Sequence, residues 1–180
     1  MHIRREKSRL AQPLSACSGT GVFVGYASLF GVRDAAGDMV MPGAFAASLQ
    51  MRGCANIRML FQHDPSEPVG TWLEMRENER GLYVRGRLDK NVQRGRELIS
   101  LLECGGLDGL SIGFRTVNAT RQKFTNTRQL MSLDLWEVSL VTFPMLPGAR
   151  VSDMKLQALI AATQLFQRPT QHKEQELTWT

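Results

Sequence analysis

Residues 69–89 read VGTWLEMRENERGLYVRGRLD, and this stretch decides the class of fold that the sequence predicts. In its second half, Leu82, Val84 and Leu88 alternate with polar side chains, and Gly86 completes the series. A period of two residues is typical of an antiparallel strand with one buried face. Residues 69–75 form a second run with strand character, and a polar turn separates the two runs. The stretch therefore predicts two strands joined by a turn.

Further strands are predicted on both sides of this pair. β-branched and aromatic residues or apolar runs mark residues 20–30, 57–61, 110–117 and 129–143. Helices are predicted at 44–52, 91–104 and 151–166, the last two from apolar residues at helical spacing. We therefore predict a β-rich α+β fold, in which a closed or nearly closed antiparallel β-barrel is packed by a few helices.

The length and the charge of the chain bound its organisation. For 180 residues we expect one domain, at 20–150, between a basic, mobile N-terminal tail (1–19) and a helical, then polar C-terminal tail (151–180). The formal charge is +5, from 22 Lys and Arg against 17 Asp and Glu. Positions 1–10 hold four of the basic residues and one acidic residue, which leaves 18 basic and 16 acidic residues elsewhere, a net charge of +2. This nearly neutral body argues against nucleic acid as a partner.

The sequence shows neither the pattern of a targeting signal nor that of paired cysteines. The basic start is not followed by the apolar run of a signal peptide, and no run is long enough for a membrane span, so we expect a soluble chain that is not exported. Cys17, Cys54 and Cys104 are odd in number and far apart, which argues against a disulfide framework or a structural zinc site. No cofactor or metal is predicted.

Two candidate functional residues, His63 and Ser111, are predicted to lie at the ends of strands. His63 follows the apolar run 57–61 and begins a Pro-containing loop, and functional residues often lie where loops leave a rigid scaffold. Ser111 lies between Gly109 and Gly113 at the start of a predicted strand, and glycines allow close backbone approach. The spacing is not that of a GxSxG elbow, so by itself it is equally typical of a turn serine.

Glu137 interrupts an otherwise apolar strand, on the predicted face of Leu133 and Leu135. A carboxylate in such a place must be paired or hydrogen-bonded. One interpretation is a salt bridge to an arginine, and the other is a carboxylate that orients a histidine during acyl transfer. Asp134 is predicted to point to the opposite face and is the weaker alternative for that role.

Taken together, these features resemble one family, the prohead maturation proteases of tailed bacteriophages, which are distant relatives of the herpesvirus assemblins. The matching stretches are GYASLFGVRDAAGDMVMPGAF (25–45), LFQHDPSEPVGTW (60–72), GLYVRGRLD (81–89), GLSIGF (109–114) and LWEVSLVTFP (135–144). They cover about residues 20–150 in order. The resemblance implies a serine endopeptidase with an assemblin-like barrel, in which His63, Ser111 and Glu137 are the catalytic residues. The chain departs from the family at 144–147, where Pro-Met-Leu-Pro replaces a Pro-Ala-Asn-like turn.

The same resemblance implies partners and a location. The substrates would be the major capsid protein and the scaffold protein, inside the immature capsid (the prohead) in the cytoplasm of the bacterial host. Self-cleavage of the protease is also expected, with the C-terminal tail as a segment that is later removed. Assemblin-like relatives are activated by dimerisation, so a homodimer is an expectation for this chain as well. The resemblance implies no membrane and no cofactor.

Two alternatives stay open at this point. A cysteine protease would pair Cys104 with His63, although Cys104 abuts two glycines at a predicted helix end and lies in no matching motif. A non-enzymatic scaffold or capsid-binding module would keep the barrel and the C-terminal helix without turnover. A metalloprotease is disfavoured because the sequence has no HExxH and a single histidine, His63, between the two tails.

Overall fold

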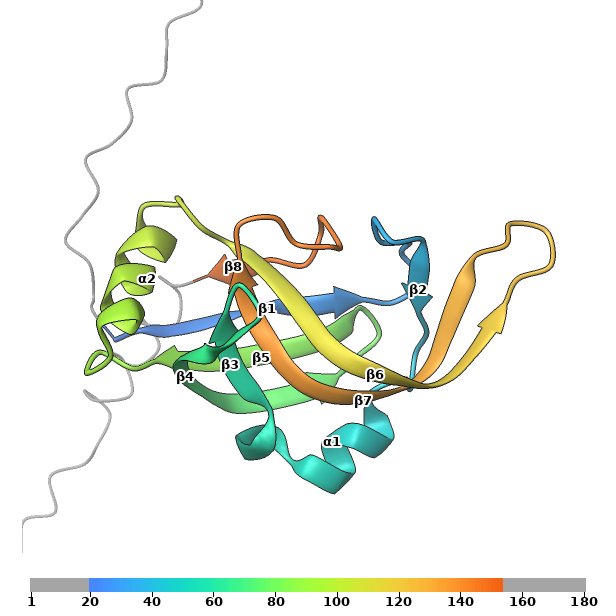
Figure 1. The fold of residues 1–180 in the computed structure, drawn as a ribbon, viewed down its shortest axis with the longest axis horizontal. Coiled ribbons are helices and arrows are strands. Elements are labelled where there is room, and N and C mark those ends of the chain that lie inside the picture. The colour runs from blue at the N-terminus through green and yellow to red at the C-terminus, as the bar shows by residue number, and fades with distance from the viewer. Residues whose placement is uncertain (1–19, 154–180) are drawn as a thin grey trace, which may run out of the picture.

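The computed structural model describes residues 20–153, which form one curled sheet with two α-helices (Figure 1). The strands are β1 (Val22–Leu29), β2 (Asp38–Val40), β3 (Arg58–Phe61), β4 (Asp64–Glu77), β5 (Gly81–Leu88), β6 (Gly109–Arg121), β7 (Arg128–Val141) and β8 (Val151–Asp153). Helix α1 (Ala46–Arg52) and a 3₁₀ turn (Cys54–Asn56) connect β2 to β3, and α2 (Gln93–Glu103) connects β5 to β6. The predicted β-rich α+β class is confirmed.

The sheet is an open half-barrel, which corrects the predicted closed or nearly closed antiparallel barrel. The strands follow the order β2-β7-β3-β4-β5-β1-β8, and β6 pairs with β7. Between β6 and the start of β8 there is a single bridge, Gly109 to Arg150, in place of a ladder, so the barrel is open. β2 and β3 also run parallel to β7. The alternation of a strand does not reveal the direction of a partner that is distant in sequence, which is why the parallel pairs were not predicted.

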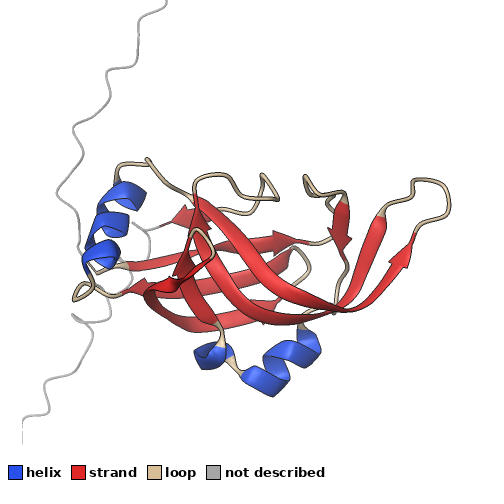
Figure 2. Cartoon of the chain, viewed as in Figure 1, coloured by secondary structure: helices blue, strands red, loops and turns tan. Residues whose placement is uncertain are grey.

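The helices cover different parts of the sheet. α1 lies against β7, and α2 covers the end of the sheet near β4 and β5 (Figure 2). Both agree with the helices predicted at 44–52 and 91–104. Residues 151–153, the start of the third predicted helix, form β8 instead, because their backbone pairs with β1. The rest of that helix, 154–166, lies outside the described residues.

The core fills the inside of the curl, and the predicted alternation of β5 is confirmed by the burial of its apolar series. Gly86 is the buried residue of this series that has no side chain. A Cβ at this position would lie 2.5 Å from Met59, 2.8 Å from Trp72 and 2.9 Å from Phe23, so the core leaves no room for one. The rings of Phe23 and Trp72 pack edge to face, with their centroids 5.7 Å apart. A glycine on the central strands therefore lets the large side chains meet in the middle of the core.

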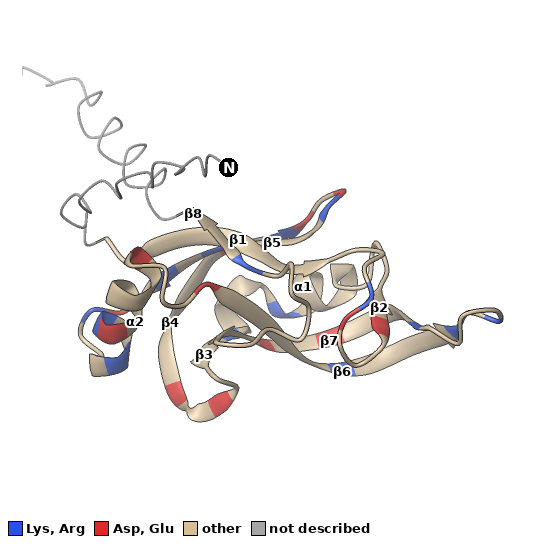
Figure 3. Cartoon of the chain, turned by 90° about the horizontal axis from the view of Figure 1, so that it is seen from above, with Lys and Arg blue, Asp and Glu red and all other residues tan. Residues whose placement is uncertain are grey.

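Charges are interspersed over most surface elements (Figure 3). The exception is the projecting β6–β7 hairpin, because residues 109–133 carry basic but no acidic side chains. Within residues 20–153, neither helix has the length and apolar character that crossing a membrane would require.

We expect Phe23→Ala to lower the free energy of unfolding by about 3–5 kcal/mol, because it removes a fully buried ring and leaves a cavity against Trp72. Urea unfolding measures the change. Phe124→Ala, which truncates a 98% exposed ring at the tip of the β6–β7 hairpin, is the control and should change stability by less than about 0.5 kcal/mol. Equal effects of the two substitutions would contradict this assignment of the core.

Candidate active site

His63 occupies a strained turn above β7. Gln62 and His63 alone connect β3 to β4, with φ of 53° and 61°. Positive φ at both central residues of a two-residue hairpin loop is the left-handed conformation that a type I′ turn requires, and it costs non-glycine residues about 1–3 kcal/mol each. Two hydrogen bonds tie the turn to β7: the Gln62 N–H donates to the Leu140 carbonyl (3.0 Å), and the His63 N–H donates to Ser139 Oγ (3.1 Å). The turn is thus held in place by the strand that it covers.

Glu137 faces this turn because β7 contains a bulge. Gly113 of β6 pairs with Glu137 and Phe114 pairs with Leu135, which leaves Trp136 without a partner on β6. The extra residue reverses the alternation, so that Leu135 is buried in the core while Glu137 is on the opposite face. The prediction that Glu137 and Leu135 share a face is therefore wrong, since alternation does not reveal a bulge.

Gly113 provides the space into which the Glu137 carboxylate extends. A Cβ on Gly113 would overlap this carboxylate. In that space Glu137 Oε1 lies 2.6 Å from His63 Nδ1, and the two side chains are 12% and 44% exposed. A carboxylate oxygen only accepts, so Nδ1 is the donor and Nε2 is the ring nitrogen that can take up a proton.

This contact changes the ionisation of His63. The hydrogen bond to Glu137 is the largest effect and raises the pKa of His63 above its ordinary value of 6.5; partial burial opposes it, and the negative charge of Glu137 adds to it. A histidine whose ring is oriented and whose basicity is increased by a carboxylate is suited to act as a general base.

Ser111 lies on β6 directly across from Ser139 of β7. Directly paired residues of neighbouring strands point to the same face, so Ser111 is on the face that carries Glu137. Ser111 is 7% exposed. Among the described residues, no hydrogen bond joins its hydroxyl to His63. Catalytic hydrogen bonds often tighten only when substrate binds. The structure thus brings His63 and Glu137 into direct contact and places Ser111 on the neighbouring strand.

Asp134, the weaker alternative to Glu137, contacts other residues. Its carboxylate accepts hydrogen bonds from Arg52 Nε (2.8 Å) and Trp136 Nε1 (2.8 Å), and Arg115 lies 3.6 Å away. The hydrogen bond from Arg52, followed by that from Trp136, lowers the pKa of Asp134. These contacts connect the bulge of β7 to α1 and do not include His63.

Gly113 and Ser139 are the site residues that sequence reasoning missed. Ser139 is fully buried, and its hydroxyl donates to Glu137 Oε2 at 2.7 Å. The sequence holds a signal for it, because a residue two positions after Glu137 shares its face of a strand. Gly113 is visible as the second glycine of GLSIGF, but only the register of β6 and β7 reveals which side chain needs its space.

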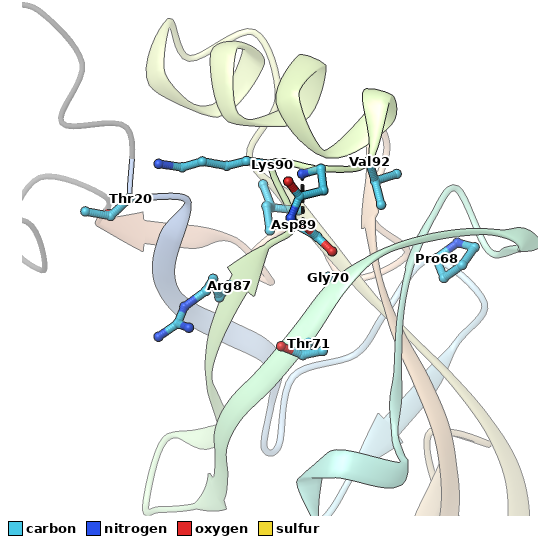
Figure 4. A pocket seen from close by; sticks show the side chains of 10 residues that line it. Thr20, Pro68, Gly70, Thr71, Arg87, Asp89, Lys90 and Val92 are labelled. Carbon is cyan, nitrogen blue, oxygen red and sulfur yellow. Dashed lines mark hydrogen bonds between the residues drawn. The ribbon is translucent and has the colours of Figure 1, made fainter.

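A cavity of about 620 Å³ lies elsewhere on the molecule (Figure 4). It is formed where β4 and β5 meet the start of α2, and its lining consists of Thr20, Pro68, Gly70, Thr71, Arg87, Leu88, Asp89, Lys90, Asn91 and Val92. None of the three predicted site residues lines it, so this cavity does not belong to the candidate active site.

The structure offers little support for the other chemistries. Cys104 lies at the end of α2, where its thiol contacts the Leu101 carbonyl (3.4 Å) and does not contact His63. Among residues 20–153, no group of three or more His, Cys, Asp or Glu side chains is arranged to hold a metal ion. The hydrogen-bonded pair of His63 and Glu137 is therefore the best-formed candidate for a catalytic site among the described residues.

The described residues thus form a β-rich fold in which a histidine is paired with a carboxylate and a serine lies on the neighbouring strand, the three side-chain types that serine hydrolases use. Residues 9–163 match the family of caudovirus prohead serine proteases, and the chain belongs to that family. The family predicted from the sequence is confirmed.

Two curated proteins show the relation in more detail. The prohead protease of Enterobacteria phage HK97 is 36% identical over 142 residues, which cover 75% of this chain and 60% of that protein. The prohead protease of Escherichia phage T5 is 30% identical over 113 residues, which cover 62% of this chain and 53% of that protein. The chain therefore spans between half and two thirds of the length of these relatives.

A solved structure supports the fold. The bacteriophage T4 capsid assembly protease matches with a TM-score of 0.57 at 13% identity, over 68% of this chain and 82% of that one. At this identity the match shows a shared fold, so the curled sheet with its helices is an architecture that the two proteins have in common.

We expect Gly113→Ala to displace the Glu137 carboxylate and thereby lower the pKa of His63 toward 6.5. An NMR titration of the His63 ring measures this pKa. Gly106→Ala is the control, because its Cβ would meet the Cys104 sulfur at 3.3 Å, after the end of α2, and would not meet the Glu137 carboxylate. A folded Gly113→Ala protein with an unchanged His63 pKa would contradict the role given to Gly113.

Proposed function

We propose that the protein is a serine endopeptidase of phage capsid maturation, which cleaves the major capsid protein and the scaffold protein inside the prohead. The observation that carries the proposal is the 2.6 Å contact between His63 Nδ1 and Glu137 Oε1, next to the strand that holds Ser111. Membership of the prohead protease family supports the choice of substrates. The proposed place of action is the capsid assembly in the cytoplasm of the bacterial host.

In the proposed mechanism, His63 Nε2 removes the proton of the Ser111 hydroxyl as the oxygen attacks a peptide carbonyl. His63 then returns this proton to the leaving amine, and a water molecule hydrolyses the acyl-enzyme in the same way. Glu137 keeps the proton of the neutral ring on Nδ1 and stabilises the imidazolium that forms. Neutral His63 is the active base, so the rate rises with pH as His63 loses its proton, around a pKa above 6.5.

The organisation of the chain follows the same proposal. Residues 20–150, with β8 (Val151–Asp153) added at their end, are the protease domain, and residues 1–19 and 154–180 are flanking tails. Self-cleavage would remove part of the C-terminal tail, and a second copy of the chain would form a homodimer. The proposed chemistry uses side chains and water, without a cofactor.

We expect Ser111→Ala to abolish cleavage, because the substitution removes the proposed nucleophile. The variant should still fold, since it loses a single hydroxyl group. Wild-type and variant proteins are each co-expressed with the major capsid protein of the same phage, and intact masses are compared. The capsid protein should be shortened only with the wild type.

Ser152→Ala is the control, since Ser152 is an exposed serine of β8 whose hydroxyl contacts the Val24 carbonyl. It should process the capsid protein as the wild type does. Cleavage by Ser111→Ala would refute Ser111 as the nucleophile, and no cleavage by any of the three proteins would favour a non-enzymatic capsid-binding module.

We expect Glu137→Gln to reduce the rate of capsid-protein cleavage by about 10²–10⁴-fold, because an amide no longer keeps the His63 ring in the required tautomer. The acidic limb of the rate profile should also move to lower pH, since the pKa of His63 falls when its carboxylate partner is lost. Rates measured between pH 5 and about 9 test both effects. Glu74→Gln, at an exposed pair with Arg76, is the control, and equal profiles for the two variants would contradict the assignment.

A further inference from the structure

Among residues 20–153, the Ser139 hydroxyl is the one side-chain group that contacts both the Glu137 carboxylate and the His63 backbone. It donates to Glu137 Oε2 at 2.7 Å and accepts from the His63 N–H at 3.1 Å. The residue is 0% exposed, and its hydrogen atom and an oxygen lone pair are both engaged. Ser139 is therefore poorly suited to attack a substrate, although it stands directly across from Ser111.

We propose that Ser139 is a positioning residue that connects Glu137 to the backbone of His63 and so fixes the geometry between the two side chains. The proposal rests on the proposed function, in which His63 is the general base. It assigns to Ser139 no contact with the reacting atoms.

The first part of the argument concerns the orientation of the carboxylate. Glu137 Oε1 accepts from His63 Nδ1 and Oε2 accepts from Ser139, so both oxygens are engaged. With one contact the carboxylate could rotate about its last side-chain bond, since such terminal torsions are broad. The second contact selects one plane for the carboxylate, and that plane directs Oε1 at the imidazole.

The second part concerns the strained turn. Gln62 and His63 adopt a left-handed conformation that persists only where the surroundings impose it. The Gln62 N–H is held by a backbone carbonyl, which any residue at position 140 would offer, whereas the His63 N–H is held by a side chain. Ser139 is thus the place where a substitution can release the His63 backbone.

The charged groups next to this site in register or in sequence contact other residues. On β3, Arg58 is in register with Glu137, and its guanidinium lies at the Ala55 carbonyl (3.5 Å). On β4, Asp64 follows His63, and its carboxylate accepts two hydrogen bonds from Ser66. No described contact joins either group to the imidazole, so a change in the titration of His63 reports on its contact with Glu137.

The test compares Ser139→Ala and Ser139→Cys in the full chain. The cysteine variant fills the same space, but its thiol is a weak hydrogen-bond donor, so it separates the hydrogen bonds from the cavity. Ser48→Ala is the matched control, because Ser48 is a 2% exposed serine whose hydroxyl accepts from the Leu135 N–H of the same strand β7. Thermal unfolding verifies that each variant is folded.

Two quantities are measured on each protein. An NMR titration gives the pKa of His63, with its ring signals assigned by comparison with His63→Gln. The rate at which a small fluorophosphonate modifies Ser111 is followed by intact mass as a function of pH. For both Ser139 variants we expect the pKa of His63 to fall toward 6.5 and the rate plateau to fall about 10- to 100-fold, as expected for a misplaced base. Ser48→Ala should change neither quantity.

The outcomes separate this proposal from the proposed function. A folded Ser139 variant with an unchanged pKa of His63, or with a loss of rate that Ser48→Ala shares, would overturn the positioning role. If the fluorophosphonate left wild-type Ser111 unmodified, the proposed function would fail, and the titration of His63 would still decide whether Ser139 controls its contact with Glu137.

Discussion

The hydrogen bond between Glu137 and His63 is the interaction on which the rest of the site depends. It places a carboxylate that is 12% exposed next to an imidazole, and such a carboxylate is unfavourable unless its oxygens are satisfied. Three local features meet this requirement. The bulge at Trp136 turns Glu137 away from the core, the missing side chain of Gly113 leaves it room, and Ser139 satisfies its second oxygen. The backbone irregularity at Trp136 and the side-chain features at Gly113 and Ser139 all serve the same contact.

The topology of the sheet explains why these features meet in one place. β7 lies between β6 on one side and the parallel strand β3 on the other. β6 brings Ser111, β7 brings Glu137, and the turn after β3 lays His63 over β7, as the arrangement in Figure 1 shows for the three strands. Three neighbouring strands thus supply one residue each, on a scaffold whose core lies on the opposite side of β7. β3 runs parallel to β7 and ends at Phe61, which is in register with Leu140. The turn that follows β3 therefore lies next to Ser139.

Much of this could be predicted from the sequence, and the failures have physical causes. Local sequence patterns were sufficient to predict the alternating burial of β5 and the positions of helices α1 and α2. The resemblance of five segments to a protease family pointed to His63, Ser111 and Glu137, two of which the structure joins by a hydrogen bond. The open barrel and the parallel pairs depend on contacts between distant segments, which periodicity does not encode. The face of Glu137 was misjudged because a bulge adds one residue without changing the composition of the strand.

The family and the geometry support the same proposal: a protease of phage prohead maturation in which a carboxylate orients the catalytic base before substrate binds. The central claim is that Glu137 fixes the tautomer of His63, and ¹⁵N NMR of the ring at a pH above its pKa tests this most directly. The account predicts a neutral ring with its proton on Nδ1, hydrogen-bonded to Glu137, and an unprotonated Nε2. A neutral ring with its proton on Nε2 would contradict the account, because that nitrogen could then accept no proton from Ser111.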